Sequence, residues 1–379
     1  MATSPGPTSG QPTANNGLAA APSSPAPARL QRSWGPACEA VLIPIGAILM
    51  ALVLFGLFCK FQGQDPFKVY ASIYKGSFGS WFAFQNTLMR TAPLMLTALC
   101  TAIPARLGMI VIGNEGALVM GGIGAVLAGL ALPALPPHLA LAAMALSGMI
   151  WGGLWITLAG ALRQYRGVNE TISSLLLNYI SIAILNHLVN GPMKDPSSLN
   201  KPSSFPIPEA NMLGRITFGE FTMRVHWGLA YGLVACLVLW FLMQRTTFGF
   251  QARFIGANPK AARLGGLPVN RTTLIACFLA GGSAGLAGMV EVAAVHGKAN
   301  ESLAAGFGYA GILVAFIARF HPLAVVPVSL LLGGILASSG ILQRAHKLPD
   351  STALVFQGLV FLVILFSESL YGRFKIFKP

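Results

Sequence analysis

Long apolar runs alternate with short polar segments along most of the chain. A run of about 20 apolar residues is long enough to cross a membrane as a helix. We predict spans at 40–59, 86–105, 109–131, 139–162, 169–189, 226–244, 273–293, 307–319, 323–342 and 353–367. The eighth and tenth runs are short, so each could instead form a broken or re-entrant helix. The pattern predicts an all-α, polytopic membrane protein with about ten transmembrane segments.

The composition supports lipid as the main solvent. Hydrophobic residues make up 54% of the chain and charged residues 9%, whereas about 25% of the residues in a typical soluble protein are charged. A net charge of +14 could suggest a nucleic-acid partner. The basic residues lie mostly in short gaps between apolar runs, however, which is typical of charges that set topology. We therefore expect membrane lipid, and no nucleic acid, around this protein.

The distribution of basic residues also predicts an orientation. If the N-terminus is inside, ten spans place the C-terminus inside as well. Lys and Arg are then denser in the inner segments than in the outer ones, as the positive-inside rule requires. Residues 1–33 are rich in Pro, Ser and Ala, and we predict a disordered tail there, followed by a membrane domain at 34–379.

Two loops are long enough to have structure of their own. Residues 190–225 form an expected outer loop with room for a short helix or a strand pair. Residues 245–272 form the main inner loop, in which Asn258-Pro259 opens a short Ala-rich run and Gly265-Gly266 closes it. These are helix start and stop signals. They predict a short amphipathic helix across the inner membrane face. No fixed-period repeat is visible.

The chain contains none of the common catalytic signatures. It has no GxxxxGK[ST] phosphate-binding loop, no paired carboxylates, no nucleophile elbow and no Cys or His spacing typical of a metal site. We therefore expect no enzyme activity, no bound cofactor and no metal.

Glu115 is the most conspicuous polar residue within a predicted span. A carboxylate at membrane depth is costly and is a candidate functional group. Gly113 and Gly116 beside it indicate a bent or broken helix. Glu115 could handle substrate or protons, or it could pair with Arg106 near the inner face or cap a helix. Asn114 beside it is an additional polar candidate for the solute path.

Asn178 lies well inside the fifth predicted span. A buried amide needs hydrogen-bond partners, so Asn178 either bonds another helix or lines a solute path. In the seventh span, Gly281 and Gly285 form a small-xxx-small pair that favours close helix packing.

Three segments together resemble a known family. They are RGVNETISSLLLNYI followed by NGPMKDP, FGFQARFIGANPKAARLGGLPVNR, and VIGNEGALVMGGIGAVLAG. They are similar to segments of the permease subunits of binding-protein-dependent ABC importers for nucleosides and simple sugars, in a broad family that also serves branched-chain amino acids. The resemblance covers about residues 40–370.

This resemblance implies a division of labour. A separate ATP-binding subunit would use ATP, an extracytoplasmic solute-binding protein would deliver the solute, and a second permease subunit, identical or similar, would complete the path in a bacterial inner membrane. The family's ATPase-coupling segment matches Gly256, Ala257, Asn258, Pro259, Ala261, Ala262 and Gly265.

Three alternatives stay open at this point. One is a permease of the same family for a simple sugar or another small polar solute. The second is an ion-coupled secondary transporter that uses Glu115, and the third is a membrane scaffold without transport activity.

Overall fold

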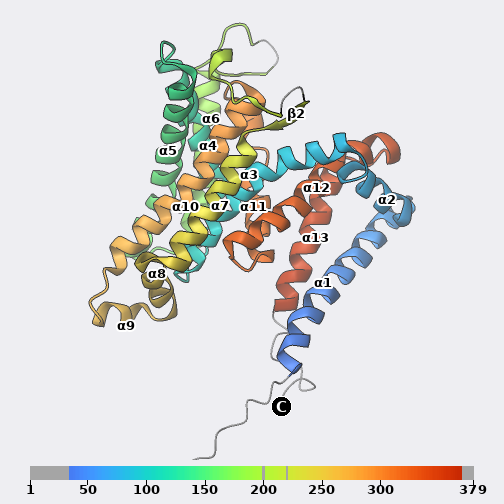
Figure 1. Ribbon diagram of the computed structural model, residues 1–379, viewed down its shortest axis with the longest axis horizontal. Coiled ribbons are helices and arrows are strands. Elements are labelled where there is room, and N and C mark those ends of the chain that lie inside the picture. The colour runs from blue at the N-terminus through green and yellow to red at the C-terminus, as the bar shows by residue number, and fades with distance from the viewer. Residues whose placement is uncertain (1–33, 199–200, 219–220, 369–379) are drawn as a thin grey trace, which may run out of the picture.

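The computed structural model describes residues 34–198, 201–218 and 221–368, which are predominantly helical (Figure 1). The predicted tail at 1–33 lies outside the described residues. The helices are α1 (Trp34–Phe61), α2 (Pro66–Ser77), α3 (Trp81–Ala105), α4 (Asn114–Ala131), α5 (Pro137–Arg166), α6 (Glu170–Asn190), α7 (Gly228–Arg245), α8 (Thr247–Ala257), α9 (Pro259–Leu264), α10 (Val269–Glu291), α11 (Phe307–Ile317), α12 (Pro322–His346) and α13 (Ser351–Glu368). The polytopic helical fold expected from the apolar pattern is confirmed.

Seven of the described helices are long and apolar enough to cross a membrane. They are α3, α4, α5, α6, α7, α10 and α12. The helical segments 46–61 and 66–77 meet at 113° and could together supply an eighth crossing. Each of the ten predicted spans contains a helix, and α11 and α13, the eighth and tenth, are short as expected. The count of ten crossings itself stays a prediction.

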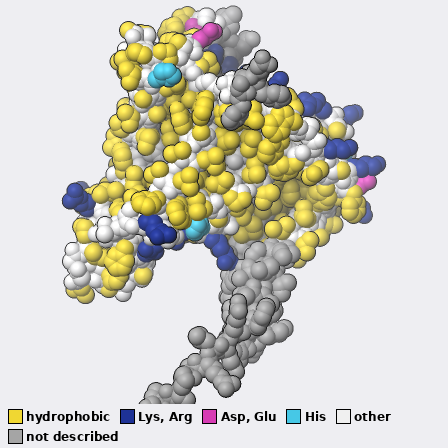
Figure 2. All heavy atoms as spheres, in the orientation of Figure 1, with side chains coloured by type: hydrophobic (Ala, Val, Ile, Leu, Met, Phe, Trp, Pro, Cys, Tyr) yellow, Lys and Arg dark blue, Asp and Glu magenta, His cyan; other side chains and the backbone are white. Residues whose placement is uncertain are grey.

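Both ends of the described chain lie on one side of the molecule. In Figure 1, α1 begins and α13 ends at the bottom, where α8 and α9 also lie. The loop between α6 and α7 is at the opposite end. Figure 2 shows apolar side chains over the middle of the molecule and Lys and Arg gathered towards its edges. Both ends of the described chain, at the start of α1 and the end of α13, therefore lie on the side of α8 and α9.

Two four-helix units share one order of elements. In each, a long helix is followed by a connecting stretch without an α-helix, a shorter helix, a long helix and a fourth helix, as in α3–α6 and α10–α13. Their contacts correspond as well: α3 packs against α11 and α12, α10 packs against α4 and α5, and α3 and α10 pack against each other. The two units thus share an order of elements and a pattern of contacts, although no fixed period is visible in the sequence.

Glycines bring α5 and α10 into backbone contact. A Cβ atom on Gly285 would lie 2.1 Å from the carbonyl oxygen of Gly148, and one on Gly281 would lie 2.2 Å from that of Gly152. A Cβ on Gly121 of α4 would likewise lie 2.2 Å from the Cα of Gly285. The predicted role of Gly281 and Gly285 in close packing is confirmed, and α4, α5 and α10 form the tightest part of the bundle.

The loop between α6 and α7, predicted to have room for a short helix or a strand pair, contains a strand pair. Strands β1 (Arg215–Phe218) and β2 (Phe221–His226) are antiparallel, with Arg215 opposite His226. A short 3-10 turn, η1 (Glu209–Asn211), precedes them. The backbone N–H of Arg224 donates to the side-chain oxygen of Gln85 on α3 at 2.8 Å, which fastens the hairpin to the bundle.

Candidate functional site

Helix α4 begins inside the bundle, because other helices bind the backbone that precedes it. The predicted span 109–131 is helical only from Asn114, so residues 109–113 correct that expectation. The hydroxyl of Ser174 accepts the N–H of Ile112 at 3.0 Å, and the hydroxyl of Thr101 donates to the carbonyl of Val111 at 3.1 Å. These side chains occupy groups that would otherwise make helical hydrogen bonds. In place of the bend or break predicted at Gly113 and Gly116, the helix starts late: α4 runs unbroken from Asn114 through Gly116.

Two buried amides, Asn178 and Asn114, make hydrogen bonds around the start of α4. Asn178 accepts the N–H of Gly116 at 2.7 Å and donates to the carbonyl of Ile112 at 2.8 Å. Asn114 donates to the carbonyl of Thr97 at 2.9 Å, and its side chain is also within hydrogen-bond distance of the Thr101 hydroxyl. Both amides are fully buried. Asn178 therefore satisfies backbone groups at the start of α4 that lack a helical partner, and Asn114 ties the first residue of α4 to the middle of α3.

Glu115 caps the N-terminus of a second helix that begins inside the bundle. Its carboxylate accepts the N–H of Gly306 at 2.7 Å and that of Gly308 at 2.5 Å, at the start of α11. The residue is 1% exposed. A carboxylate is stabilised at a helix N-terminus by the unpaired N–H groups and by the helix dipole. Of the roles considered for Glu115, this geometry corresponds to the helix cap.

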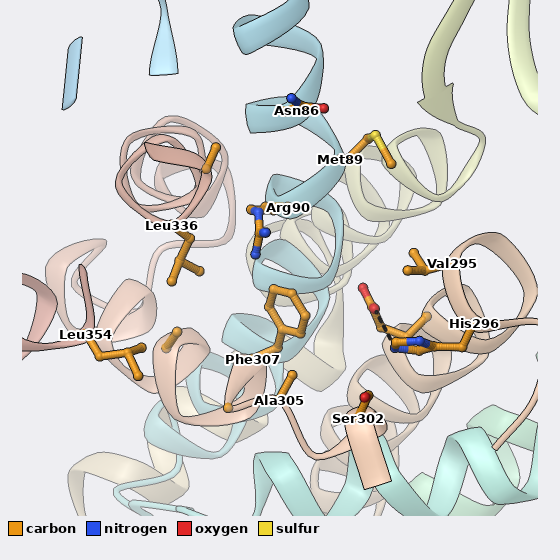
Figure 3. Close-up of a pocket in the computed structure, with 14 residues that line it drawn as sticks. Asn86, Met89, Arg90, Val295, His296, Ser302, Ala305, Phe307, Leu336 and Leu354 are labelled. Atoms are coloured by element: carbon orange, nitrogen blue, oxygen red, sulfur yellow. Dashed lines mark ion pairs between the residues drawn. The ribbon is translucent and has the colours of Figure 1, made fainter. Parts of the chain in front are cut away.

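A cavity of about 500 Å³ lies beside this capped helix (Figure 3). Its lining comes from α3, from the end of α10, from the segment before α11, and from α11, α12 and α13. The lining residues are Asn86, Met89, Arg90, Glu291, Val295, His296, Ser302, Ala305, Gly306, Phe307, Ala310, Leu336, Ala337 and Leu354. Asn114, Glu115 and Asn178 do not line it, and their place in a solute path stays a prediction.

The cavity combines charged, polar and aromatic groups. Glu291 and His296 lie 3.7 Å apart as a carboxylate–imidazole pair, on the last turn of α10 and the π-helical turn η2 (Val292–His296) after it. Figure 3 shows Arg90 pointing from α3 towards the ring of Phe307. A volume of this size is typical of a small-molecule site. No sequence pattern singles out this group, since its members meet only through packing of α3, α10 and α11.

A second cavity of about 360 Å³ adjoins the first and shares Asn86 and Met89 with it. It lies beneath the hairpin and is also lined by Arg215, Arg224 and His226. Burial lowers the pKa of His226 to about 4, so its ring is neutral at pH 7. The two cavities together place polar groups between the hairpin and the start of α11.

The inner loop forms two helices where the sequence predicted one. The side chain of Asn258 accepts the N–H groups of Lys260 and Ala261 at 3.1 and 3.0 Å, Pro259 occupies the first turn of α9, and Gly265 follows its end. These limits of α9 are as predicted. Helix α8 precedes it directly and carries the first two residues of the expected coupling segment, Gly256 and Ala257, at its end.

The exposed surface of this helix pair is partly apolar. Leu264 is 91% exposed at the end of α9. Ala257, Asn258, Pro259 and Gly265 are exposed, Gly256 and Ala261 are half-buried, and Ala262 is buried. The coupling segment therefore has an inward part that packs on the bundle and an outward part that is free to meet another surface.

Comparison with known proteins gives the chain a family. The model of the family described as branched-chain amino acid transport system / permease component matches residues 83–365. The glucose ABC transporter permease protein TsgB13 of Haloferax volcanii is 29% identical, over 90% of this chain and 91% of the relative. The guanosine ABC transporter permease protein NupP of Bacillus subtilis is 28% identical, over 89% and 96% of the two chains.

A third relative is similar over nearly as much of the chain. The nucleoside ABC transporter permease protein NupB of Lactococcus lactis is 25% identical, over 85% of this chain and 90% of the relative. All three relatives are permeases of ABC transporters, and an ABC importer permease is the role of this chain as well. The family match covers residues 83–365, which include most of the helical bundle. The protein therefore belongs to the family of permease components of branched-chain amino acid transport systems.

Proposed function

We propose that this chain forms the solute path of a bacterial inner-membrane ABC importer for a nucleoside or a related sugar-containing solute. The observation on which this proposal depends is that Arg90, Glu291, His296 and Phe307 line one cavity. Two of the three relatives described above are named for guanosine or nucleosides and one for glucose. These names support a solute with a sugar ring.

The chemistry of the cavity suits an uncharged polar solute. The carboxylate of Glu291 and the hydroxyl of Ser302 can bind ribose hydroxyls, and Phe307 offers a face for stacking of a base. The positive charge of Arg90 is balanced by Glu291 within the same cavity. A phosphorylated solute would carry at least one further negative charge without a second cationic partner in this lining, so a nucleoside fits better than a nucleotide.

Energy would come from a separate ATP-binding subunit docked on α8 and α9. The outward residues of the coupling segment surround Leu264, whose exposed side chain offers an apolar anchor for the partner. A short helix pair joined by loops to two long helices can pass on movement of a partner as a rigid body. No cofactor is required in this chain, because ATP would be used by the partner.

The outer side and the second half of the path would come from other proteins. Residues 190–225, which include the hairpin, would contact an extracytoplasmic solute-binding protein. A second permease subunit, identical or similar, would complete the path. An exposed apolar band over the middle of the molecule (Figure 2) provides surface for this subunit as well as for lipid.

The proposal is tested by reconstituting the complete transporter in vesicles. We expect ATP-dependent uptake of radiolabelled guanosine that excess unlabelled nucleoside suppresses and leucine does not. In Glu291→Gln and Phe307→Leu, the KM for guanosine should rise about 10- to 100-fold, as expected when about 1.5–3 kcal/mol of binding is lost. Asp350→Asn, at an exposed site outside both the cavity and residues 190–225, is the control. Uptake without ATP, or an unchanged KM in both variants, would overturn the proposal.

A further inference from the structure

The connection between α3 and α4, residues 106–113, touches the inner helix pair directly. A Cβ atom on Gly256 of α8 would lie 2.2 Å from the carbonyl oxygen of Arg106. Gly108, at φ 71°, faces the same residue, and a Cβ there would lie 3.5 Å from the carbonyl oxygen of Gly256. Backbone meets backbone at this point, so no flexible side chain can absorb a displacement. Movement of α8 towards the bundle therefore displaces the connection.

The side chain of Arg106 fastens this connection to the inner end of α11. Its guanidinium donates to the carbonyl of Phe320 from Nε at 3.3 Å and from Nη2 at 3.1 Å. Phe320 lies three residues beyond the end of α11, in a turn where Arg319 and Phe320 have φ values of 49° and 56°. A cation near the C-terminus of a helix is also favoured by the helix dipole. The C-terminal end of α11 is thus tied to Arg106.

The opposite end of α11 is tied to Glu115, just beyond the same connection. Besides accepting the N–H groups of Gly306 and Gly308, Glu115 meets Gly308 so closely that a Cβ on the glycine would lie 2.2 Å from the Glu115 nitrogen. A helix of 11 residues is about 16 Å long. Helix α11 is therefore held at one end by Arg106, the first residue of the connection, and at the other end by Glu115, two residues beyond the connection.

This clamped helix also forms part of the cavity wall. Gly306, Phe307 and Ala310 line the cavity, with Phe307 as the first residue of α11 (Figure 3). We propose that residues 106–113 transmit movement of α8 to α11 as one rigid connection, and so change the cavity when the ATP-binding subunit closes. Gly256 and Arg106 act as positioning residues in this step. The inference rests on the proposed function, since it supplies the ATP-driven movement.

The test measures coupling and cavity access in the complete transporter. Ala305→Cys, at an exposed position of the cavity lining, is labelled with a membrane-impermeant maleimide, nucleotide-free and with ATP plus vanadate. Cys59, Cys100, Cys236 and Cys277 are buried, and the fifth cysteine, Cys38, is replaced by Ser in the reporter protein, which keeps background labelling low. In the reporter protein we expect the labelling rate to differ about tenfold between the two states, within the usual range of allosteric coupling.

Gly256→Ala and Arg106→Gln should abolish this difference. Arg106→Gln should retain the ATP-binding subunit and hydrolysis stimulated by the binding protein, and in both variants the solute transported per ATP should fall about tenfold. Arg106→Lys, which keeps the charge and one donor, should partly restore coupling. Gly340→Ala is the matched control, because no atom lies within 4 Å of its added Cβ. If the transporter complex with Gly256→Ala does not assemble, the result for Arg106→Gln alone tests the proposal. This substitution leaves the backbone contact between residue 106 and α8 in place.

The outcomes separate the two proposals. ATP-driven uptake by the unsubstituted complex, combined with a normal coupling ratio and a normal labelling change in the variants, would overturn the transmission role and leave the proposed function intact. No ATP-driven uptake by the unsubstituted complex would overturn the proposed function itself. A labelling difference lost in Gly256→Ala and Arg106→Gln but kept in Gly340→Ala is the expected result.

Discussion

Replacing Glu115 with Gln removes a charge without changing the length of the side chain. In the native protein the two carboxylate oxygens accept separate N–H groups, from Gly306 and from Gly308. Glutamine has one oxygen and one NH₂ group, so it can accept only one of them. The other N–H would face a second donor at a site where Glu115 is 1% exposed and water cannot replace the lost acceptor.

The expected cost follows from these contacts. A buried donor left without a partner costs about 1–3 kcal/mol, and loss of a negative charge at a helix N-terminus adds about 0.3–2 kcal/mol. We expect the docking of α11 to weaken by about 2–4 kcal/mol, which raises the fraction of open molecules about 30- to 700-fold. The effect is local, because the substitution leaves the packing of α5 and α10 unchanged.

Amide hydrogen exchange measures the weakened docking of α11 at the affected residues. Exchange at residues 306–310 should accelerate by the same factor, while exchange in the middle of α5 and α10 stays close to that of the parent. Glu209→Gln, at an exposed position, is the matched control. A change at 306–310 of less than about threefold, well under 1 kcal/mol, would refute the reasoning from the cap.

The same variant separates the cap from an ion-coupling role of Glu115. A coupling carboxylate would make uptake depend on an ion gradient, and Glu115→Gln would abolish that dependence. We expect no ion-gradient dependence in the parent or in the variant, and a reduced but still ATP-dependent rate of uptake in the variant. Uptake that is driven by a proton or sodium gradient in the parent would restore the secondary-transport alternative.

Three further predictions concern other parts of the molecule. Leu264→Glu should lower the amount of ATP-binding subunit that co-purifies about tenfold or more, since burying a leucine contributes about 1.5–3 kcal/mol; unchanged recovery would contradict the docking site. Burial lowers the pKa of His226 from 6.5 to about 4, so stability should fall by up to about 3 kcal/mol between pH 6.5 and pH 4, and melting curves of His226→Phe should lack this part of the decrease. Gly285→Ala should lower the melting temperature, because its Cβ would lie 2.1 Å from the carbonyl oxygen of Gly148; Gly282→Ala, with 3.4 Å to its nearest neighbour, is the control, and equal melting of the two variants would exclude this explanation.

Local signals allowed the inner helix α9 to be predicted with its limits. Asn258, Pro259 and Gly265 act within a few residues of their own positions, as a side-chain cap, a first-turn residue and a C-terminal stop. Predictions of this kind succeed because the interactions that decide them are close in the sequence.

The start of α4 depended on interactions that are distant in the sequence. Gly113 and Gly116 indicate a bend in the apolar run 109–131, but they do not show that residues 109–113 are non-helical. The partners of this stretch are Thr101, Ser174 and Asn178 on other helices. The cavity was missed for the same reason. Arg90 and Glu291 each lie alone near the end of an apolar run, and only the packing of α3 on α10 brings both to one cavity.

The backbone contact between α5 and α10 gives this transporter an internal reference frame. Helices that touch through glycine carbonyls have no side chains between them that could repack during a transport cycle, so the distance between them should stay constant. Spin labels at Leu158 on α5 and Ile275 on α10, both exposed, should therefore give one unchanging distance distribution in every nucleotide state. Displacements measured from this pair to α11 would then report motion of α11 alone, free of any tumbling or tilting of the whole subunit.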